Sequence, residues 1–414
     1  MRIAVFTENS HAGGLDTVIA TLIDAWPRNE TEGGENDEFV LICNRSHPGL
    51  DVIKRRLSRP VKIVAHDAPL HWEWVALFER PGIPGLVRKV ISVLSRYPFF
   101  LYWLFKAKTL LAGEAADRLL VVNGGYPAGD SCRAAAVAWT WAAPGKPPCV
   151  FNFHNLAVAP RAWERWIEGI VDGLVLGGTG VFVAVSKACA ASMANRPAIA
   201  GSGRVIHIHN GIAEFKPPSA RPREIREGLD IPVAAPLCLM LGTYEPRKGH
   251  AFLLGAFRRV LKDRPDAFLV ICGHGYPGDV KRVRALVDEM GLAENVRLEG
   301  FREDVAALIE AADILTVSSQ AFESFGLTIV EAMARATPVV ATNVGGIPEV
   351  IGDDEGGYCL SATDEAGFAA RIVSLIKDEG LRKQMGEKGR RRFLERFTAQ
   401  RMAREYASLV WRET

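Results

Sequence analysis

The stretch Leu237-Cys-Leu-Met-Leu-Gly-Thr-Tyr-Glu-Pro-Arg-Lys-Gly249 contains a short apolar run, a polar loop and the start of an apolar helical pattern. The run has the length and composition of a buried strand, and the loop after it contains adjacent arginine and lysine. Similar runs alternate with helical patterns in both halves of the chain, which predicts parallel sheets covered by helices. The expected fold class is therefore α/β, with two doubly wound domains.

The strands expected in the first half are residues 2–7, 38–43, 61–65, 118–122, 150–154, 181–186 and 205–209. Those expected in the second half are residues 237–241, 267–272, 296–299, 314–317, 338–341 and 357–360. A chain of 414 residues is too long for one core, and two domains are expected. A stretch rich in proline and charge places their boundary near Pro217, so the domains are residues 1–216 and 217–392, followed by a helical segment 393–414.

The composition of the chain argues against several classes of function. The chain is 48% hydrophobic and 24% charged with a net charge of +2, so no nucleic-acid partner is indicated. The first residues run directly into a strand without a signal-peptide pattern, which predicts a cytoplasmic protein. The longest very apolar stretch, residues 98–105, is far shorter than the roughly 20 residues that span a bilayer.

Two glutamates flank the stretch Glu323-Ser-Phe-Gly-Leu-Thr-Ile-Val-Glu331. The apolar pattern predicts a helix from about Gly326 to Arg335, whose first N–H groups and positive dipole end can meet an anion. A carboxylate beside a phosphate is unfavourable unless hydroxyl groups donate hydrogen bonds to it, and a sugar provides them. The stretch therefore indicates a site for a sugar attached to phosphate. Alternatively, Glu331 forms an ordinary surface pair with Arg335.

Loops that follow strands are the expected ligand sites of a doubly wound sheet. Gly13-Gly14 follows the first strand, and paired glycines let N–H groups approach a phosphate, although such pairs are also common in simple turns. Arg247 and Lys248 follow a strand in the second half, where a guanidinium fork and a mobile ammonium suit a diphosphate. Without that context, the two cations are an ordinary solvated surface pair.

The loop Gly273-His-Gly-Tyr-Pro-Gly278 fits the dinucleotide-binding pattern G-x-G-x-x-G, and Glu299 lies about 20 residues further on, where a ribose-binding acid is expected. The pattern follows the second strand of its half instead of the first, which weakens it. A dinucleotide-dependent oxidoreductase is therefore kept as an alternative function.

Histidines are the remaining candidates. His154 ends an expected strand at the edge where the sheet presents ligands, and it is either functional or a hydrogen-bonded structural residue. His207 and His209 alternate along another strand and can share a metal ion on one face, but no third ligand is evident. No metal site is predicted.

Taken together, these segments resemble the retaining glycosyltransferases of family 4. The likeness rests on Gly13-Gly14, His154, Asn210-Gly211 and residues 242–249, 300–304, 323–331 and 338–349. It is dense over residues 239–350 and weaker over residues 39–123. It implies the GT-B fold, two Rossmann-like domains facing a central cleft, with the C-terminal helix crossing back to the first domain.

The resemblance implies an acceptor-side first domain and a second domain that binds a nucleotide-diphosphate sugar. Glu323 and His154 take the catalytic positions, where Glu323 grips the transferred sugar and supports its developing positive charge. Arg247 and Lys248 contact the diphosphate, and Glu331 contacts the ribose. The donor-binding residues are then Gly13, Gly14, Thr243, Arg247, Lys248, Gly273, Phe301, Arg302, Phe325, Gly326, Leu327 and Glu331.

Four positions depart from the family pattern. Thr243 stands where many members have a phosphate-binding arginine, Ala336 replaces a glycine after the helix, and Ser318 and His209 replace prolines. These departures bear on the phosphate geometry and leave the class unchanged.

The implied reaction is retaining transfer of a hexose to a carbohydrate or lipid-linked carbohydrate acceptor, in the synthesis of cell-surface polysaccharide, lipopolysaccharide or glycolipid. The departing phosphate oxygen takes the acceptor proton, and the cations and the helix dipole replace a metal ion. A UDP- or GDP-sugar is the co-substrate, and no cofactor is expected. A GT-B nucleotide-sugar epimerase is the main alternative function.

The segment 86–108 mixes basic and aromatic residues. In one interpretation it lies in a membrane interface, which predicts a peripheral protein on the inner face of the membrane. In the other it forms two core helices broken at Pro98.

Overall fold

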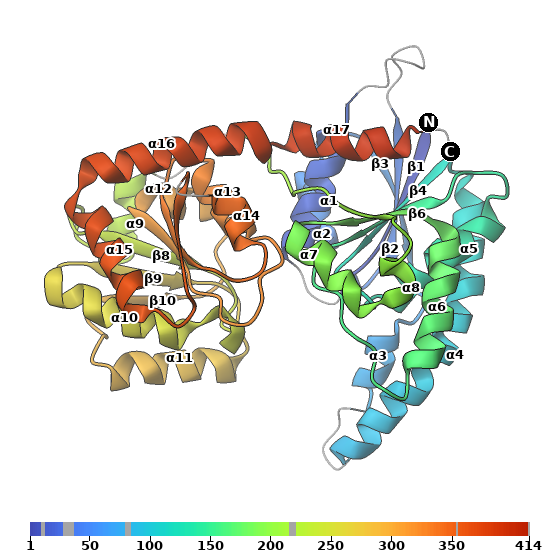
Figure 1. Cartoon of the computed structure of the whole chain (residues 1–414), viewed down its shortest axis with the longest axis horizontal. Coiled ribbons are helices and arrows are strands. Elements are labelled where there is room, and N and C mark those ends of the chain that lie inside the picture. Colours follow the sequence, from blue (N-terminus) through green and yellow to red (C-terminus); the bar gives the residue numbers. More distant parts are fainter. Residues whose placement is uncertain (10–12, 28–36, 79–83, 215–220, 353–354, 413–414) are drawn as a thin grey trace. The chain divides into compact units, whose positions relative to one another are not determined.

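The computed structural model describes residues 1–9, 13–27, 37–78, 84–214, 221–352 and 355–412 (Figure 1). The chain forms two compact units: unit 1 contains Met1–Gly211 and Ala399–Thr414, and unit 2 contains Ile212–Thr398. Pro217, where the sequence places the first boundary, lies outside the described residues. The second boundary was expected at residue 393, but this residue lies inside a continuous helix, and the chain leaves unit 2 only after Thr398.

Unit 1 is built on a parallel sheet of seven strands in the order β3-β2-β1-β4-β5-β6-β7. The strands are β1 (Arg2–Glu8), β2 (Glu38–Asn44), β3 (Val61–His66), β4 (Arg118–Asn123), β5 (Cys149–Phe153), β6 (Thr179–Ala184) and β7 (Val205–His207). The helices are α1 (Gly14–Asp24), α2 (Leu50–Arg56), α3 (His71–Ala76), α4 (Gly85–Glu114), α5 (Asp130–Ala142), α6 (Arg165–Gly178), α7 (Lys187–Ala191), η2 (Ser192–Asn195), α8 (Pro197–Ala200) and α17 (Ala399–Val410). Figure 1 shows α1, α2 and α17 on one face of this sheet and α4, α5 and α6 on the other.

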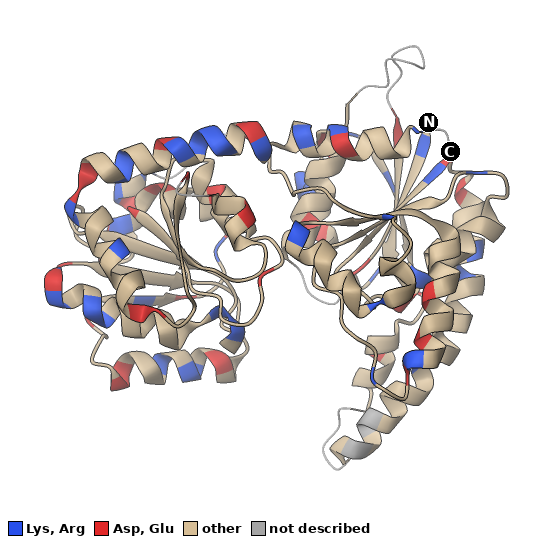
Figure 2. Ribbon diagram, in the orientation of Figure 1, with Lys and Arg blue, Asp and Glu red and all other residues tan. Residues whose placement is uncertain are grey.

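Unit 2 is built on a parallel sheet of six strands in the order β10-β9-β8-β11-β12-β13. The strands are β8 (Leu237–Leu241), β9 (Phe268–Cys272), β10 (Val296–Glu299), β11 (Ile314–Val317), β12 (Val339–Thr342) and β13 (Gly357–Leu360). The helices are α9 (Pro222–Gly228), η3 (Pro246–Lys248), α10 (His250–Asp263), α11 (Pro277–Glu289), α12 (Val305–Ala311), α13 (Leu327–Met333), α14 (Ile347–Ile351), α15 (Glu365–Lys377) and α16 (Glu379–Arg396). Lysine and arginine are frequent along α16 (Figure 2).

Both sheets reverse their strand order between two neighbouring strands, β1 and β4 in unit 1 and β8 and β11 in unit 2. Loops that leave such a pair diverge to opposite faces of the sheet, and the crevice between them is where doubly wound folds bind ligands. The strands beside these points are almost wholly buried, as parallel strands covered on both faces must be. The structure thus offers one candidate ligand edge in each unit.

The predicted strands are confirmed to within two residues at their ends, and the helix predicted from about Gly326 to Arg335 is confirmed to the same precision, but two other helical expectations are wrong. The helix expected to reach Arg335 ends at Met333, because Ala336 has a left-handed backbone (φ 55) and the Thr337 N–H turns back to the Ala332 carbonyl. The C-terminal segment is two helices, since Phe397-Thr398 separates α16 from α17.

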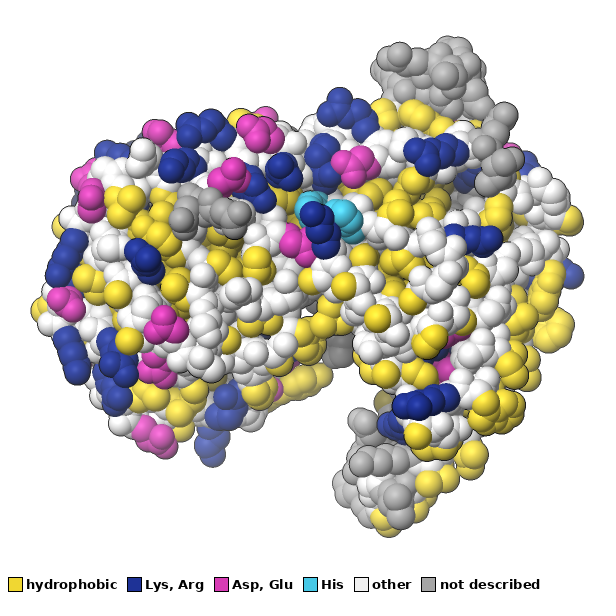
Figure 3. Space-filling view, viewed as in Figure 1, with side chains coloured by type: hydrophobic (Ala, Val, Ile, Leu, Met, Phe, Trp, Pro, Cys, Tyr) yellow, Lys and Arg dark blue, Asp and Glu magenta, His cyan; other side chains and the backbone are white. Residues whose placement is uncertain are grey.

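The second correction concerns α4, which is a single helix of 30 residues that runs through Pro98. The interpretation of two helices broken at this proline is therefore wrong. Several large apolar side chains of α4 are exposed, and Figure 3 shows hydrophobic side chains over the lower right part of unit 1, where Figure 1 draws α4. No helix in the described part of the chain is long and apolar enough to cross a membrane.

Candidate functional site

The loops that follow β8 and β11 interlock at the ligand edge of unit 2. The Ser318 hydroxyl donates to the Lys248 carbonyl (2.8 Å), and the Gln320 N–H donates to the Arg247 carbonyl (2.8 Å). Gly249 has φ 74, and a Cβ at this position would lie 1.9 Å from the Ser318 carbonyl oxygen. Only glycine can readily adopt this backbone conformation and also leave room for the carbonyl oxygen. Contacts between their backbones therefore hold the two loops together.

Lys248 and Glu323 form an ion pair in this crevice, with 2.6 Å between Nζ and Oε2. Both side chains are mostly buried, being 16% and 13% exposed. The stem of Lys248 lies along Gly242, and the Ser319 hydroxyl donates to Glu323 Oε2 (3.1 Å). The structure therefore brings together two predicted site residues that are 75 positions apart in sequence.

A pair of glycines fixes the backbone of Glu323. The Gly346 N–H donates to the Glu323 carbonyl (2.8 Å). Gly345 has φ 58, and a Cβ there would lie 2.0 Å from the same oxygen. Sequence reasoning included these glycines only as part of the family pattern, and the structure shows that they position the carboxylate that is paired with Lys248.

The partners of Arg247 differ from those of Lys248. Its guanidinium forms an ion pair with Glu245 and lies 5.0 Å from the centroid of the Phe322 ring. A guanidinium held over a ring keeps its charge and has a defined plane, and the donors that Glu245 does not use can bind phosphate oxygens. Both cations therefore lie along the loop after β11.

Thr243 and Gly273 flank the end of β8. The Thr243 hydroxyl is buried and has no hydrogen-bond partner among the described residues. Because buried polar atoms in native proteins are nearly always paired, this hydroxyl indicates a ligand or water at the crevice. A Cβ on Gly273 would lie 1.9 Å from the Gly242 carbonyl oxygen, so close packing of the two strand ends requires this glycine.

The dinucleotide pattern has a packing explanation. It follows β9, which is not beside the reversal point of the sheet. Gly273 packs on Gly242, and a Cβ on Gly275 would lie 2.7 Å from the Cβ of Tyr244. Gly278 has open space around it and is already inside α11. Because packing accounts for the first two glycines, the pattern gives no support to an oxidoreductase.

The Phe-Gly-Leu turn is anchored by its aromatic residue. Phe325 is buried, and its ring packs edge-on against Phe397 at 5.9 Å between centroids. Gly326 has φ 95 and precedes Leu327, the first residue of α13. The Phe325 side chain therefore faces the core of unit 2, and this residue can offer a donor only its backbone.

Glu331 lies half-buried on α13. Arg335, its alternative partner, forms an ion pair with Glu310 of α12. Burial lowers the pKa of Arg335, and the carboxylates of Glu310 and Glu331 oppose that shift. The surface-pair interpretation thus describes only part of the environment of Arg335.

Phe301 and Arg302 lie in the loop after β10. Phe301 is 69% exposed and offers a flat apolar surface. The Arg302 guanidinium is held by both oxygens of Asp304, at 2.8 and 2.6 Å. The loop therefore presents a ring beside a fixed cation.

In unit 1, Gly13 and Gly14 lie at the start of α1 and are exposed. The Gly13 N–H donates to the carboxylate of Asp16 (2.7 Å), which is fully buried, and His47 Nε2 lies 3.9 Å from the same carboxylate. Sequence reasoning did not include Asp16 in the site, although an acid three residues after a glycine is a recognisable sign of a helix start.

His154 follows β5, and its backbone N–H donates to the Asn123 carbonyl (3.0 Å). Its Nε2 is buried and has no partner among the residues that the structure describes. Burial lowers the pKa of His154 to about 3, so the imidazole is neutral near pH 7. The ring can exchange a hydrogen bond with a hydroxyl group but cannot supply positive charge.

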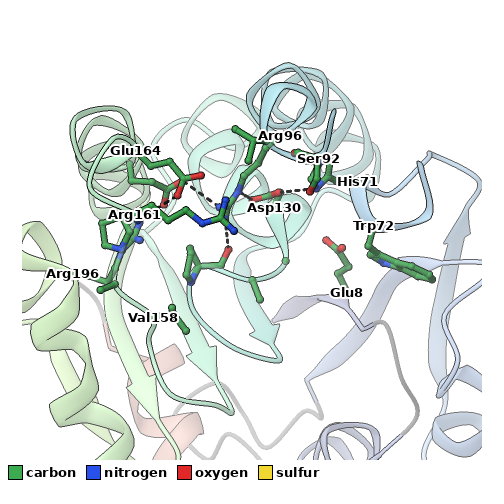
Figure 4. Close-up of a pocket in the computed structure, with 17 residues that line it drawn as sticks. Glu8, His71, Trp72, Ser92, Arg96, Asp130, Val158, Arg161, Glu164 and Arg196 are labelled. Carbon is green, nitrogen blue, oxygen red and sulfur yellow. Dashed lines mark hydrogen bonds and ion pairs between the residues drawn. The ribbon is translucent and has the colours of Figure 1, made fainter. Parts of the chain in front are cut away.

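A cavity of about 430 Å³ also lies in unit 1 (Figure 4). Its lining residues include Glu8 at the end of β1, His71 and Trp72 of α3, Arg96 of α4 and Glu164, which directly precedes α6. Burial raises the pKa of Glu8 to about 7, although a hydrogen bond from Ser131 opposes the shift. None of these side chains was a predicted site residue.

A buried ion network supports one wall of this cavity. Arg196 donates to Asp172 through two nitrogens, at 2.7 and 2.8 Å, and also pairs with Glu168. Arg133 Nη1 lies 3.0 Å from Glu168. Burial alone would raise the pKa of Glu168, but the guanidinium groups of Arg133, Arg96 and Arg196 lower it to about 2. No sequence signal marks these residues, since a buried arginine looks like any other in the sequence.

The described residues contain no group of three or more histidine, cysteine or acidic side chains that could hold a metal ion. The rings of His207 and His209 lie 5.1 Å apart between centroids.

Residues 222–392 match the family model described as glycosyl transferases group 1. The chain is 33% identical over 156 residues to the N-acetyl-alpha-D-glucosaminyl L-malate synthase of Bacillus anthracis, which covers 38% of this chain and 40% of that protein. It is 30% identical over 185 residues to the lipopolysaccharide core biosynthesis glycosyltransferase LpsE of Rhizobium meliloti, covering 45% and 52%. Each match spans about half of the relative's length or less.

Two solved structures are similar over almost the whole chain. HepE of Anabaena in complex with UDP superimposes with a TM-score of 0.72 at 19% identity, covering 99% of both chains. A glycosyltransferase from Rickettsia africae superimposes with a TM-score of 0.74 at 18% identity, covering 99% of this chain and 97% of the other. At these identities the likeness shows the fold alone.

Proposed function

We propose that this chain is a retaining hexosyltransferase, because residues 222–392 match the group 1 glycosyl transferases and the chain has the GT-B fold predicted from its sequence. The donor is a UDP- or GDP-sugar, and the acceptor is a carbohydrate or lipid-linked carbohydrate of cell-surface polysaccharide or glycolipid synthesis. The contact of Lys248 with Glu323 at the reversal point of unit 2 is the observation that supports this proposal most strongly.

The pair suits the two halves of such a donor. A sugar diphosphate places negative charge beside a ring of neutral hydroxyl groups, and Lys248 and Glu323 place an ammonium beside a carboxylate at 2.6 Å. Lys248, Arg247 and the Thr243 hydroxyl bind the diphosphate in this proposal, and Glu323 binds the hexose. Glu331 binds the ribose, and Phe301 and Arg302 lie beside the nucleotide base.

In the proposed reaction, the bond between the anomeric carbon and the donor phosphate oxygen breaks, and an acceptor oxygen bonds to that carbon on the same face. The departing phosphate oxygen takes the acceptor proton. Glu323 stabilises positive charge on the sugar, while Lys248 and Arg247 stabilise negative charge on the diphosphate. The proposal requires no metal ion, because these cations meet the leaving group.

Unit 1 is proposed to contribute Gly13, Gly14 and His154 to donor binding. A neutral His154 with an unpaired Nε2 suits a sugar hydroxyl, and the exposed Gly13 and Gly14 suit a phosphate or sugar oxygen. We place the reaction in the cytoplasm or at the inner face of the membrane, where nucleotide sugars are available.

Release of nucleotide diphosphate from UDP- and GDP-sugars, with and without acceptor extracts, tests the proposal. Glu323→Gln should lower kcat at least about 100-fold, as loss of one transition-state contact does, while Glu331→Gln should chiefly raise KM. The anomeric proton coupling in the product distinguishes retention from inversion. Unchanged transfer by both Glu323→Gln and Lys248→Ala would sink the assignment of the site.

An epimerase is the second candidate, because the same donor residues serve a reaction that needs no acceptor. Interconversion of two nucleotide sugars without nucleotide release would favour it over transfer.

A further inference from the structure

Tyr244 lies in the loop after β8, directly after Thr243 and shortly before Arg247 and Lys248. Its side chain is only 1% exposed, although the loop belongs to the ligand edge of unit 2. Loops usually run over the surface of a protein and are more mobile than the strands they join. A buried tyrosine in this loop therefore raises the question of what it holds in place.

The Tyr244 hydroxyl reaches the ends of β9 and β10, the next two strands of the sheet (Figure 1). It lies 2.8 Å from the Glu299 carbonyl oxygen and 3.0 Å from the Ile271 carbonyl oxygen. A phenol has one proton to donate, so the two carbonyl groups share it. Burial raises the pKa of Tyr244, which keeps this proton on the hydroxyl. The side chain thus ties the loop after β8 to Glu299, the last residue of β10.

Other contacts fix the position of this hydroxyl. The Tyr244 N–H donates to the His274 carbonyl (2.9 Å), and Arg282 of α11 donates to the Tyr244 carbonyl (2.9 Å). A Cβ on Gly275 would lie 2.7 Å from the Cβ of Tyr244, so the loop after β9 packs directly on this residue. The Tyr244 ring is stacked on His250, the first residue of α10, with 5.4 Å between centroids and 3° between planes. Contacts with three neighbouring segments therefore hold the tyrosine in one orientation.

The segments that Tyr244 joins are the two halves of the proposed donor site. Lys248 follows Tyr244 in the same loop, and Glu299 directly precedes the loop that contains Phe301 and Arg302. In the proposed function, Lys248 binds the diphosphate, and the other two residues lie beside the nucleotide base. The Tyr244 hydroxyl is thus a direct hydrogen bond between the diphosphate loop and the strand end that carries the base loop.

Two further hydrogen bonds attach the start of the base loop to β9. The Cys272 thiol donates to the Gly300 carbonyl (3.1 Å), and the Gly273 N–H donates to the Glu299 carbonyl (3.4 Å). Both donors belong to the end of β9, so they hold the base loop to the sheet but not to the cations. Loss of the Tyr244 hydroxyl should therefore alter the spacing of the two loops without unfolding either of them.

We propose that Tyr244 is a positioning residue for the nucleotide-sugar donor. Its hydroxyl sets the distance between the cations that bind the diphosphate and the loop that lies beside the base, so that one nucleoside diphosphate can contact both. This inference rests on the proposed function and adds to it a residue that acts through its neighbours. A spacing that exists before the donor arrives lowers the entropic cost of binding, because neither loop has to be ordered by the ligand.

Binding of UDP, GDP and inorganic pyrophosphate to the full chain, measured by calorimetry, tests this inference. Tyr244→Phe keeps the ring and its stacking on His250 but removes the shared proton. It should raise the dissociation constant of the more tightly bound nucleoside diphosphate about tenfold, the usual effect of losing one buried hydrogen bond. The dissociation constant of pyrophosphate, which meets only the cations, should stay the same. In turnover, KM for the nucleotide sugar should rise while kcat is unchanged.

Thr316→Val is the matched control. Thr316 is buried in β11, and its hydroxyl donates to the Leu239 carbonyl of β8 (3.1 Å), so this variant also removes one buried hydroxyl from the sheet of unit 2. Urea unfolding establishes that both variants are folded. Thr316→Val should leave the affinity for all three ligands unchanged. Equal weakening of nucleoside diphosphate binding in the two variants would overturn the inference, because a general loss of stability would then explain it.

A double-mutant cycle with Phe301→Ala separates positioning from a general structural role. If Tyr244 acts through the loop that contains Phe301, its hydroxyl should matter less once that ring is absent. Tyr244→Phe should then raise the dissociation constant of the nucleoside diphosphate by less than about threefold in the Phe301→Ala background. Fully additive effects of the two substitutions, or an equal loss of pyrophosphate affinity in Tyr244→Phe, would show that the tyrosine does not set the spacing of the loops.

The same measurements distinguish this inference from the proposed function. If UDP or GDP binds and Lys248→Ala weakens that binding, but Tyr244→Phe does not, the positioning role is wrong and the proposed function stands. If neither UDP nor GDP binds the original protein, the proposed function is wrong, and with it the role of Tyr244.

Discussion

The ion pair of Lys248 and Glu323 shows how single residues define the ligand that unit 2 can bind. Each side chain is mostly buried, and the two opposite charges neutralise each other. A ligand with adjacent anionic and hydroxyl-bearing parts can engage both groups at once. Sequence reasoning identified the two residues, but their contact depends on the crossing of two loops.

A double-mutant cycle of Lys248→Met and Glu323→Gln should give a coupling energy of about 1–2 kcal/mol in the free energy of unfolding, because the pair is shielded from water. The exposed pair Lys383 and Glu379, also 2.6 Å apart, is the matched control and should give less than about 0.5 kcal/mol. Urea unfolding measures both cycles. Equal coupling in the two pairs would mean that the crevice does not shield Lys248.

Glu8 should make the stability of unit 1 depend on pH. The pKa of Glu8 is about 7 in the folded chain and 4.5 in the absence of burial. As the pH rises, the unfolded state therefore releases the proton of Glu8 before the folded state does. The contribution of Glu8 to the stability of unit 1 is therefore fully present below about pH 4.5 and is lost as the pH rises through about 7.

Glu8→Gln should remove this dependence. The variant should be more stable than the original protein by about 1–3 kcal/mol near pH 8, and the gap should close near pH 4.5. Thermal unfolding at the two pH values measures the effect. A destabilisation of the same size at both pH values would contradict it.

At the scale of elements, glycines between strand and helix determine the site. Gly249 and Gly345 each combine a left-handed backbone with a neighbouring carbonyl oxygen about 2 Å from where a Cβ would lie. These glycines let the loops after β8, β11 and β12 approach one another. The sequence predicted the strands well, because short buried apolar runs identify them locally. It predicted the helical segments less well, because α4 continues through Pro98 and Phe397-Thr398 separates α16 from α17.

Gly345→Ala should destabilise unit 2 by more than about 2 kcal/mol and should displace Glu323, because the new Cβ meets its carbonyl oxygen. Gly291→Ala is the matched control, since Gly291 has φ 68 but open space around it, and it should lose only about 1 kcal/mol. Chemical unfolding and donor turnover measure both variants. Similar losses in stability at the two positions would show that the loop accommodates the methyl group.

At the scale of the whole molecule, the chain returns to unit 1 through α17. Met402 and Tyr406 are buried, and the Asn152 side chain donates to the Tyr406 hydroxyl (2.6 Å). Arg118 also donates to the Val410 carbonyl (2.8 Å). The last helix is therefore part of the core of unit 1, although it follows unit 2 in sequence.

Deletion of residues 399–414 should destabilise unit 1 by at least about 3–5 kcal/mol, the usual effect of removing one buried aromatic side chain. Unit 2 should keep its resistance to proteolysis, because α16 ends before the deletion. Limited proteolysis followed by fragment identification measures this difference. Deletion of residues 412–414 alone is the control, and cleavage that begins in unit 2 would contradict the prediction.

The sequence by itself determined the parallel α/β organisation and the chemistry of the loops after the strands, because burial of short apolar runs and the properties of Gly, Lys, Arg and Glu are local. Only the tertiary structure decided that Lys248 meets Glu323, that Phe325 turns into the core, and that Arg133, Arg196 and Glu168 form a buried network. These contacts join residues far apart in the chain, and their geometry depends on how the strands are ordered. The type of a residue determines what its side chain can bind, while the topology of the chain determines which other residues lie near that side chain.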